Sequence, residues 1–115
     1  MSRPLRVLFV CSRNRLRSPT AEAVVADWPG VEAVSAGTAP DAEARVSADL
    51  VEWADVVVAF EARHRRQLVR AFGPLLRDAR VVALGVPDDY VAMDPALVRL
   101  LRERLPPLLG VGPST

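Results

Sequence analysis

Short apolar, β-branched runs alternate about four times along the chain with stretches whose apolar residues recur at helical spacing. The apolar runs predict buried strands, and the periodic stretches predict helices. The predicted strands are residues 5–10, 31–35, 55–60 and 80–84, and the predicted helices are residues 18–28, 47–53, 61–72 and 94–105. Helical crossovers between successive strands require a mainly parallel sheet with helices on both faces. The predicted fold class is therefore α/β, a three-layer αβα arrangement around a four-stranded parallel sheet.

Capping signals set the expected ends of these helices. Ser18 is placed to cap the first helix, because Pro19 after it suits the first helical position. Asp94 and Pro95 repeat this arrangement before the last helix. Two consecutive prolines are expected to end that helix, which leaves residues 106–115 as a loosely ordered tail.

The composition bounds the classes of function. A chain of 115 residues is the size of a single domain, here 1–115. Its 15 basic residues, all arginine, nearly balance 14 acidic ones, and this net charge of +1 disfavours a nucleic-acid partner. The apolar runs are far shorter than the roughly 20 residues that span a bilayer, so we expect no membrane partner and a cytoplasmic location. One cysteine and one histidine are too few for a disulfide or a zinc site, so neither a metal nor another cofactor is expected.

The loop after the first strand carries the clearest chemical signal. Ligands of parallel sheets bind beyond the carboxyl ends of the strands, so the loops after Val10, Ser35, Phe60 and Leu84 are the places to inspect. In the first of these loops, five residues separate a cysteine from an arginine.

Cys11 and Arg17 suit the binding of a phosphoryl dianion. The loop between them can curl so that its amides point inward beside a helix N-terminus, which favours both an anion and a cysteine thiolate. The planar fork of an arginine can grip two phosphoryl oxygens while the sulfur attacks phosphorus. A Walker-type nucleotide loop is excluded because residues 11–18 contain neither glycine nor lysine.

The segment from Val10 to Glu22, which reads VCSRNRLRSPTAE, resembles the phosphate-binding signature of the low-molecular-weight protein tyrosine phosphatases. The sequence SAGT at residues 35–38 is similar to a turn after the second strand of that family. The resemblance implies a flavodoxin-like four-stranded fold and metal-free hydrolysis through a phosphocysteine. By position, Cys11 would be the nucleophile and Arg17 the phosphate clamp.

The resemblance also implies roles for the neighbouring residues. Ser18 would donate a hydrogen bond to the sulfur, and Asn14, a residue type that tolerates left-handed backbone, would hold the shape of the loop. The substrate-binding residues would be Ser12, Arg13, Asn14, Arg15, Leu16, Ser18 and Tyr90, with Leu16 where the family often has a second cysteine.

A late loop would supply the general acid, which the family usually carries in the sequence Asp-Pro-Tyr. Matching on Tyr90 selects Asp88, although Asp89 stands where proline is usual and is the alternative acid. Tyr90 either borders the pocket or packs in the core. His64, flanked by three arginines, is expected on a solvated basic helix face.

These residues together predict a phosphomonoester hydrolase, with phosphotyrosine in a protein or a small aryl phosphate as substrate. Three alternatives stay open. One is arsenate reduction, for which an external thiol would replace the additional cysteines that this chain lacks. The others are a cysteine-phosphorylated carrier and a non-catalytic module that binds phosphate or phosphotyrosine.

Overall fold

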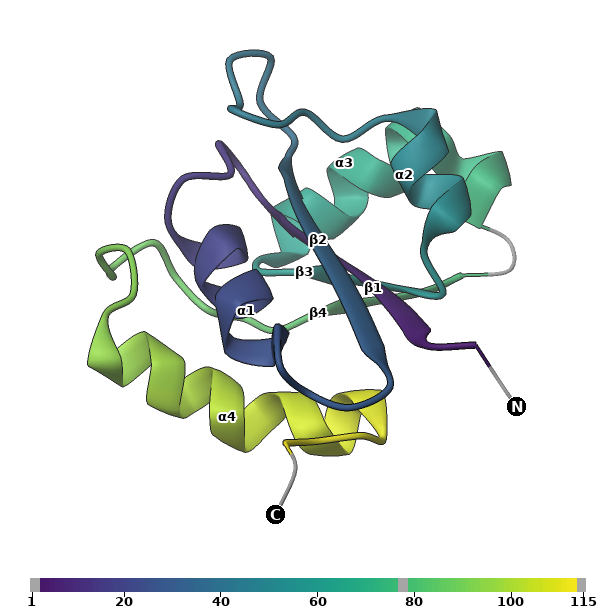
Figure 1. The fold of residues 1–115 in the computed structure, drawn as a ribbon. Helices are drawn as coiled ribbons and strands as arrows, with labels where there is room; N and C mark the ends of the chain where they lie inside the picture. The colour runs from purple at the N-terminus through teal and green to yellow at the C-terminus, as the bar shows by residue number, and fades with distance from the viewer. Residues whose placement is uncertain (1–2, 77–78, 114–115) are drawn as a thin grey trace.

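The protein folds around one parallel sheet. The computed structural model describes residues 3–76 and 79–113. The strands β1 (Leu5–Cys11), β2 (Val31–Gly37), β3 (Val56–Ala59) and β4 (Arg80–Ala83) lie in the order β2-β1-β3-β4, and all neighbours are parallel (Figure 1). The predicted four-stranded parallel sheet is confirmed.

Helices cover both faces of the sheet (Figure 1). Helices α1 (Arg17–Val25) and α4 (Pro95–Leu109) pack together on one face. Helices α2 (Ala48–Trp53) and α3 (Ala62–Phe72) lie on the other, with the short 3₁₀ helix η1 (Gly73–Leu76) after α3. The three-layer αβα architecture is therefore also confirmed.

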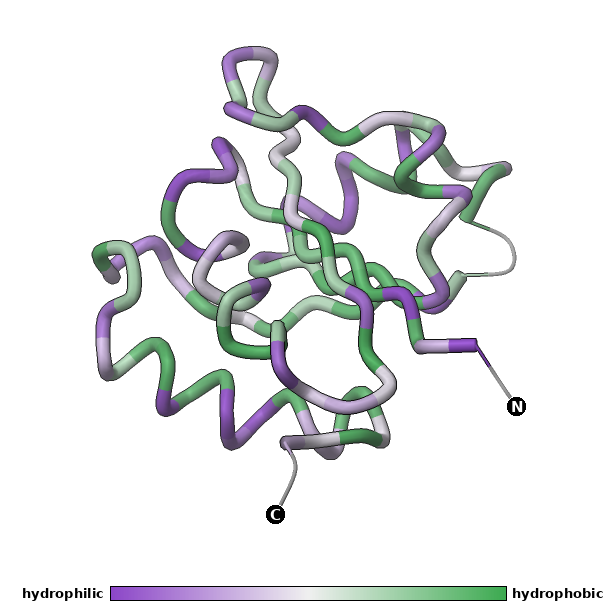
Figure 2. The backbone as a smooth tube through the Cα atoms, in the orientation of Figure 1, coloured by the Kyte–Doolittle hydropathy of each residue, from purple (hydrophilic) through white to green (hydrophobic). Residues whose placement is uncertain are grey.

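Strand β1 supplies both halves of the core, because successive side chains of a strand point to opposite faces. Val7 and Phe9 are buried in the cluster that includes the apolar residues of α1 and α4, whereas Leu8 and Val10 are buried in the cluster beneath α2 and α3. Figure 2 shows the strands as the hydrophobic centre of the molecule. This two-sided burial accounts for the continuous apolar run at residues 7–10.

The strand order places a switch of direction at β1. From β1 the chain crosses to β2 on one side, and from β2 it crosses back past β1 to β3 on the other side. The loops that leave the neighbouring ends of β1 and β3 therefore run in opposite directions. Such a point at the carboxyl edge of a parallel sheet leaves a crevice for a ligand. Cys11 is the last residue of β1 and therefore lies at this crevice.

The expected end of the last helix is wrong. Helix α4 continues through Pro106 and Pro107 to Leu109, so residues 106–109 are helical and do not begin a loosely ordered tail. Leu105 and Leu109 are both buried, and Gly110 ends the helix in a left-handed conformation with its N–H bonded to the Pro106 carbonyl. Burial of this apolar face offsets the backbone hydrogen bonds that the prolines cannot make. Among the helices at residues 3–76 and 79–113, none is long and apolar enough to cross a bilayer.

Candidate active site

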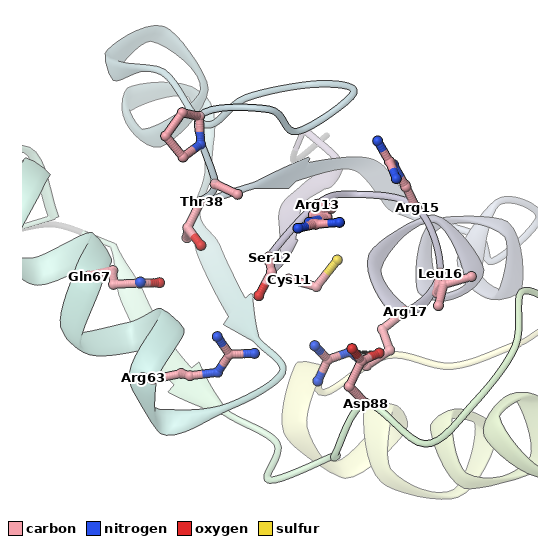
Figure 3. Close-up of a pocket in the computed structure, with 12 residues that line it drawn as sticks. Cys11, Ser12, Arg13, Arg15, Leu16, Arg17, Thr38, Arg63, Gln67 and Asp88 are labelled. Atoms are coloured by element: carbon pink, nitrogen blue, oxygen red, sulfur yellow. Dashed lines mark ion pairs between the residues drawn. The ribbon is translucent and has the colours of Figure 1, made fainter.

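A cavity of about 670 Å³ opens at the carboxyl end of β1 (Figure 3). Its floor and part of its wall come from the loop that joins β1 to α1, and the rest of the wall comes from the loop after β2, from α3 and from the loop after β4. The first group of lining residues is Cys11, Ser12, Arg13, Arg15, Leu16 and Arg17. The second group includes Thr38, Arg63, Gln67 and Asp88. Elements distant in sequence thus converge on the sulfur of Cys11.

The backbone of residues 11–14 is turned so that its amides face away from the loop after β2. The carbonyls of Cys11, Ser12 and Arg13 accept hydrogen bonds from the N–H groups of Thr38 (3.0 Å), Ala39 (2.8 Å) and Glu43 (3.1 Å). In a trans peptide the following N–H points opposite to the carbonyl. The amides of residues 12–14 therefore point to the other side, and within the described chain none of the amides of residues 12–16 has a hydrogen-bond partner. Such a curl of free amides is an anion-binding nest.

Gly37 allows the two loops to approach this closely. A Cβ atom at this position would lie 2.5 Å from the Ser12 carbonyl oxygen and 2.7 Å from the Ala42 side chain. Both distances are far below van der Waals contact, so a larger residue would push the loop after β2 away from the nest. This packing requirement explains the glycine of the SAGT sequence at residues 35–38.

Asn14, Ser18 and Cys11 contact one another at the floor of the nest. Asn14 has the left-handed φ of 57° expected of it, and its Oδ1 accepts a hydrogen bond from the Ser18 hydroxyl at 2.8 Å. The same hydroxyl lies 3.0 Å from Cys11 Sγ. Ser18 has one hydroxyl proton, so it can stabilise the thiolate when that proton turns from Asn14 to the sulfur. Cys11 is only 3% exposed, which places the sulfur at the bottom of the cavity.

The expected capping role of Ser18 is wrong. Helix α1 begins one residue earlier, at Arg17, and its N-cap Leu16 makes no side-chain capping bond. The Ser18 hydroxyl points back toward Cys11 because Asn14 and the sulfur offer it buried polar partners. The residue therefore belongs to the nest and not to the helix cap.

Arg17 is 2% exposed and is fixed by contacts at one end of its guanidinium group. Its Nη1 donates to Glu61 Oε2 at 2.7 Å and to the Val86 carbonyl at 2.8 Å, so both protons of that nitrogen are used. The Nε–Nη2 edge has no such bonds among the described residues. That edge is the one with two parallel donors for a phosphoryl group.

Glu61 is a functional residue that the sequence analysis missed. It follows Phe60, just beyond the end of β3, which is a position that the rule for parallel sheets marks for inspection. A glutamate at that position does not by itself indicate which residue it pairs with. Hydrogen bonds from Arg63 and Arg17 lower the pKa of Glu61 to about 2, against the cost of burial. Glu61 is therefore ionised at neutral pH and is a permanent counterion for Arg17.

The expectation of a solvated His64 is wrong, since its side chain is 0% exposed. Its Nδ1 accepts a hydrogen bond from the Glu61 N–H at 3.1 Å, within a capping box at the start of α3. Its Nε2 lies 2.9 Å from the hydroxyl of Ser12. Burial, with smaller contributions from the charges of Arg63 and Arg17, lowers the pKa of His64 to about 4.

We predict that the imidazole of His64 titrates near pH 4 in the folded protein. The desolvated ring disfavours the charged form, so His64 stays neutral through the physiological range, and acid favours unfolding between pH 6.5 and about 4. Histidine-selective NMR would measure the titration without ambiguity because the chain has one histidine. The urea-unfolded chain, expected to titrate near the ordinary value of about 6.5, is the control. A folded-state value near 6.5 would contradict the buried placement.

Asp88 lies in the cavity wall, whereas Asp89 does not line the cavity. The Asp88 carboxylate is 3.7 Å from Arg17 Nε, and its side chain is 62% exposed (Figure 3). Tyr90 is not brought to the cavity, because its ring packs against the core cluster beside α4. Of these three residues, the structure brings Asp88 alone beside the loop of residues 11–17.

Arg13 and Arg15 extend outward from the loop and pair with the segment after β2. Arg13 lies 3.7 Å from Asp41, and Arg15 lies 3.5 Å from Glu43. These side chains are largely exposed, so each pair contributes little to stability. In the chain as described, no group of three or more His, Cys, Asp or Glu side chains is arranged to hold a metal ion.

Comparison with known sequences gives one informative relative. No family model matches the chain. A protein-arginine-phosphatase from Geobacillus stearothermophilus is 34% identical in an alignment that covers 60% of this chain and 63% of the relative. The chain thus spans less than two thirds of the length of the curated relative that it matches.

Solved structures match the fold over nearly the whole chain. The YwlE arginine phosphatase from Geobacillus stearothermophilus has a TM-score of 0.71 at 24% identity and covers 93% of this chain and 94% of its own. The tyrosine phosphatase Wzb from Escherichia coli K30, solved with phosphate, has a TM-score of 0.73 at 19% identity, with coverage of 91% and 98%. A low-molecular-weight protein tyrosine phosphatase from Bacillus subtilis has a TM-score of 0.66 at 24% identity, with coverage of 86% and 93%. The resemblance drawn from the loop sequence is confirmed, and the fold is that of these phosphatases.

Proposed function

We propose that this chain, which has the fold of the low-molecular-weight protein tyrosine phosphatases, is a cysteine-dependent phosphatase. The observation that carries the proposal is the arrangement around Cys11: its sulfur lies at the bottom of a nest of free amides, beside the Nε–Nη2 edge of Arg17, which makes no hydrogen bond among the described residues and has Asp88 at 3.7 Å. Amides and guanidinium donors together match the three non-bridging oxygens of a phosphoryl group. The nucleophile and the anion site are thus built by one loop.

The reaction would proceed in two displacements. In the first, Cys11 Sγ forms a bond to phosphorus as the phosphorus–oxygen bond of the substrate breaks, and Asp88 gives its proton to the leaving oxygen. In the second, water attacks phosphorus, Asp88 takes a proton from that water, and the sulfur leaves as thiolate. Arg17 and the loop amides stabilise the charge that spreads over the phosphoryl oxygens.

The position of Asp88 favours this chemistry over the alternatives. A carrier that keeps its phosphocysteine, or a module that only binds phosphate, has no need of a carboxylate in the wall of the site, and Asp88 stands there. Arsenate reduction would require an external thiol, because the chain has no second cysteine.

The substrate is proposed to be a phosphorylated protein or small aryl phosphate, with phosphotyrosine preferred. Besides Arg17, three arginines line the cavity, namely Arg13, Arg15 and Arg63, against the single carboxylate of Asp88. The ion pairs that Arg13 and Arg15 make with carboxylates outside the lining are largely exposed, so screening weakens them, whereas Arg63 is paired with the partly buried Glu61. The neutral ring of phosphotyrosine fits these surroundings better than the guanidinium of phosphoarginine, although the curated relative is an arginine phosphatase. We place the protein in the cytoplasm, where a catalytic thiol stays reduced.

A pre-steady-state assay with an excess of an aryl phosphate tests the proposal. We expect a burst of phenol release equal to the amount of enzyme, followed by steady release of inorganic phosphate. Phosphotyrosyl and phosphoarginyl peptides of one sequence, compared in the same assay by kcat/KM, would test the choice of substrate. Tight phosphate binding without turnover would indicate a binding module, and a phosphoprotein that persists for hours would indicate a carrier.

A further inference from the structure

His64, the one histidine of the chain, lies directly behind the phosphate-binding loop. Its side chain is fully buried at the start of α3, where it contacts the backbone of Glu61 and the side chain of Ser12. The proposed chemistry gives this residue no role. A satisfied network of buried hydrogen bonds holds its members in fixed positions, so we look for the role of His64 in the two groups that it contacts beside the reactive loop.

The two contacts fix the position of the ring proton. The Glu61 N–H can only donate, so His64 Nδ1, 3.1 Å away, must be an acceptor without a proton. The ring is neutral at pH 7, because its pKa is lowered to about 4. Its single proton is then on Nε2, and this N–H donates to Ser12 Oγ at 2.9 Å.

This assignment determines what Ser12 can offer to the cavity. Its hydroxyl accepts a hydrogen bond from the ring behind it, so its own proton is not given to His64. Its carbonyl is occupied by the Ala39 N–H, and its side chain lines the cavity next to Cys11 (Figure 3). The acceptors expected in that cavity are the oxygens of a phosphoryl group.

We propose that His64 is a positioning residue that holds the Ser12 hydroxyl as a hydrogen-bond donor to the phosphoryl group. The inference rests on the proposed phosphatase function and adds a side-chain donor to the loop amides and Arg17. Such a donor helps most where charge on the oxygens changes between ground and transition state. Its loss should therefore lower kcat more than it raises KM.

Three substitutions separate this role from the capping of α3. In His64→Asn, the amide oxygen can take the place of Nδ1 and still accept from the Glu61 N–H, but the side chain is too short to reach Ser12. In His64→Gln, the terminal nitrogen can reach the place of Nε2. Ser12→Ala removes the hydroxyl itself and leaves the cap untouched.

The experiment is a double-mutant cycle with an aryl phosphate substrate. We expect Ser12→Ala and His64→Asn each to lower kcat about 10- to 100-fold, less than the 10²- to 10³-fold typical of an oxyanion-hole donor, because the amides and Arg17 remain. KM should change by less than about threefold. The double variant should be no slower than Ser12→Ala, since His64 acts through Ser12, and His64→Gln should recover part of the loss.

Independent, multiplying losses in the double variant would overturn the inference, as would a Ser12→Ala enzyme with the kcat of the wild type. Thermal unfolding and binding of inorganic phosphate would verify that each variant folds. If His64→Asn does not fold, the other two variants still decide the matter. An unchanged kcat in Ser12→Ala contradicts the inference, and so does a His64→Gln enzyme in which the Ser12 hydroxyl gives no benefit to kcat. Wild type and Cys11→Ser in the same assay keep the two proposals apart. An inactive wild type or an active Cys11→Ser overturns the phosphatase proposal itself.

Discussion

Replacing Cys11 by serine should reduce turnover of an aryl phosphate at least about a thousandfold, since a serine hydroxyl is a weak nucleophile without an adjacent base. In this structure the groups that face the sulfur are Ser18, which can serve as a hydrogen-bond donor, and the free amides of the nest. These groups stabilise a thiolate but cannot remove a proton from an alcohol. Steady-state hydrolysis of a chromogenic aryl phosphate would measure the loss.

Phosphate binding provides the control for this variant. The amides of the loop and the Nε–Nη2 edge of Arg17 do not depend on the sulfur, so Cys11→Ser should still bind inorganic phosphate in a calorimetric titration. Activity above about one thousandth of the wild type would refute the assignment of Cys11 as nucleophile. Loss of phosphate binding together with activity would instead indicate that the loop had changed shape.

Replacing Asp88 by alanine should slow substrates with poor leaving groups by about 10²- to 10⁴-fold and those with good leaving groups far less. A good leaving group departs without help, whereas an alkoxide or a basic phenoxide needs a proton as the phosphorus–oxygen bond breaks. The dependence of kcat/KM, which reports the first displacement, on leaving-group basicity should therefore steepen in Asp88→Ala when it is measured over a series of aryl phosphates.

Asp89→Ala is the matched control, because it removes the same carboxylate one residue away from a position outside the cavity. We expect it to stay within about twofold of the wild type across the series. An equal loss of kcat/KM for all substrates in Asp88→Ala would assign Asp88 a binding role. A larger effect from Asp89→Ala would move the acid to the neighbouring residue.

Local sequence sufficed for the features that depend on neighbours along the chain. The buried run of β1 requires a strand covered on both faces, and Asp94 caps α4 through the Ala96 N–H as its pairing with Pro95 indicates. Asn14 adopts the left-handed backbone that its residue type tolerates. The sequence also located the nest, since Cys11 and Arg17 flank a loop of fixed length between a strand and a helix.

The remaining parts of the site depend on residues far apart in sequence. Arg17 and Glu61 meet at 2.7 Å across 44 residues, and Ser12 and His64 meet at 2.9 Å across 52. Three neighbouring arginines made His64 look solvated, but an imidazole at the first turn of α3 faces inward, whichever charges flank it in sequence.

The amino-acid sequence by itself determined the α/β class and the strand–loop–helix unit that places Cys11 and Arg17 at the two ends of one loop, because these follow from hydrophobic periodicity and short-range backbone preferences. The tertiary structure alone decided that Asp88 and not Asp89 lines the cavity, that the partly buried Tyr90 packs against the core, and that Glu61 and His64 support the loop. Those choices depend on how the loops after β1, β3 and β4 meet at one edge of the sheet. The packing of the helices on the two faces of the sheet fixes how these loops meet, and no local sequence pattern indicates it.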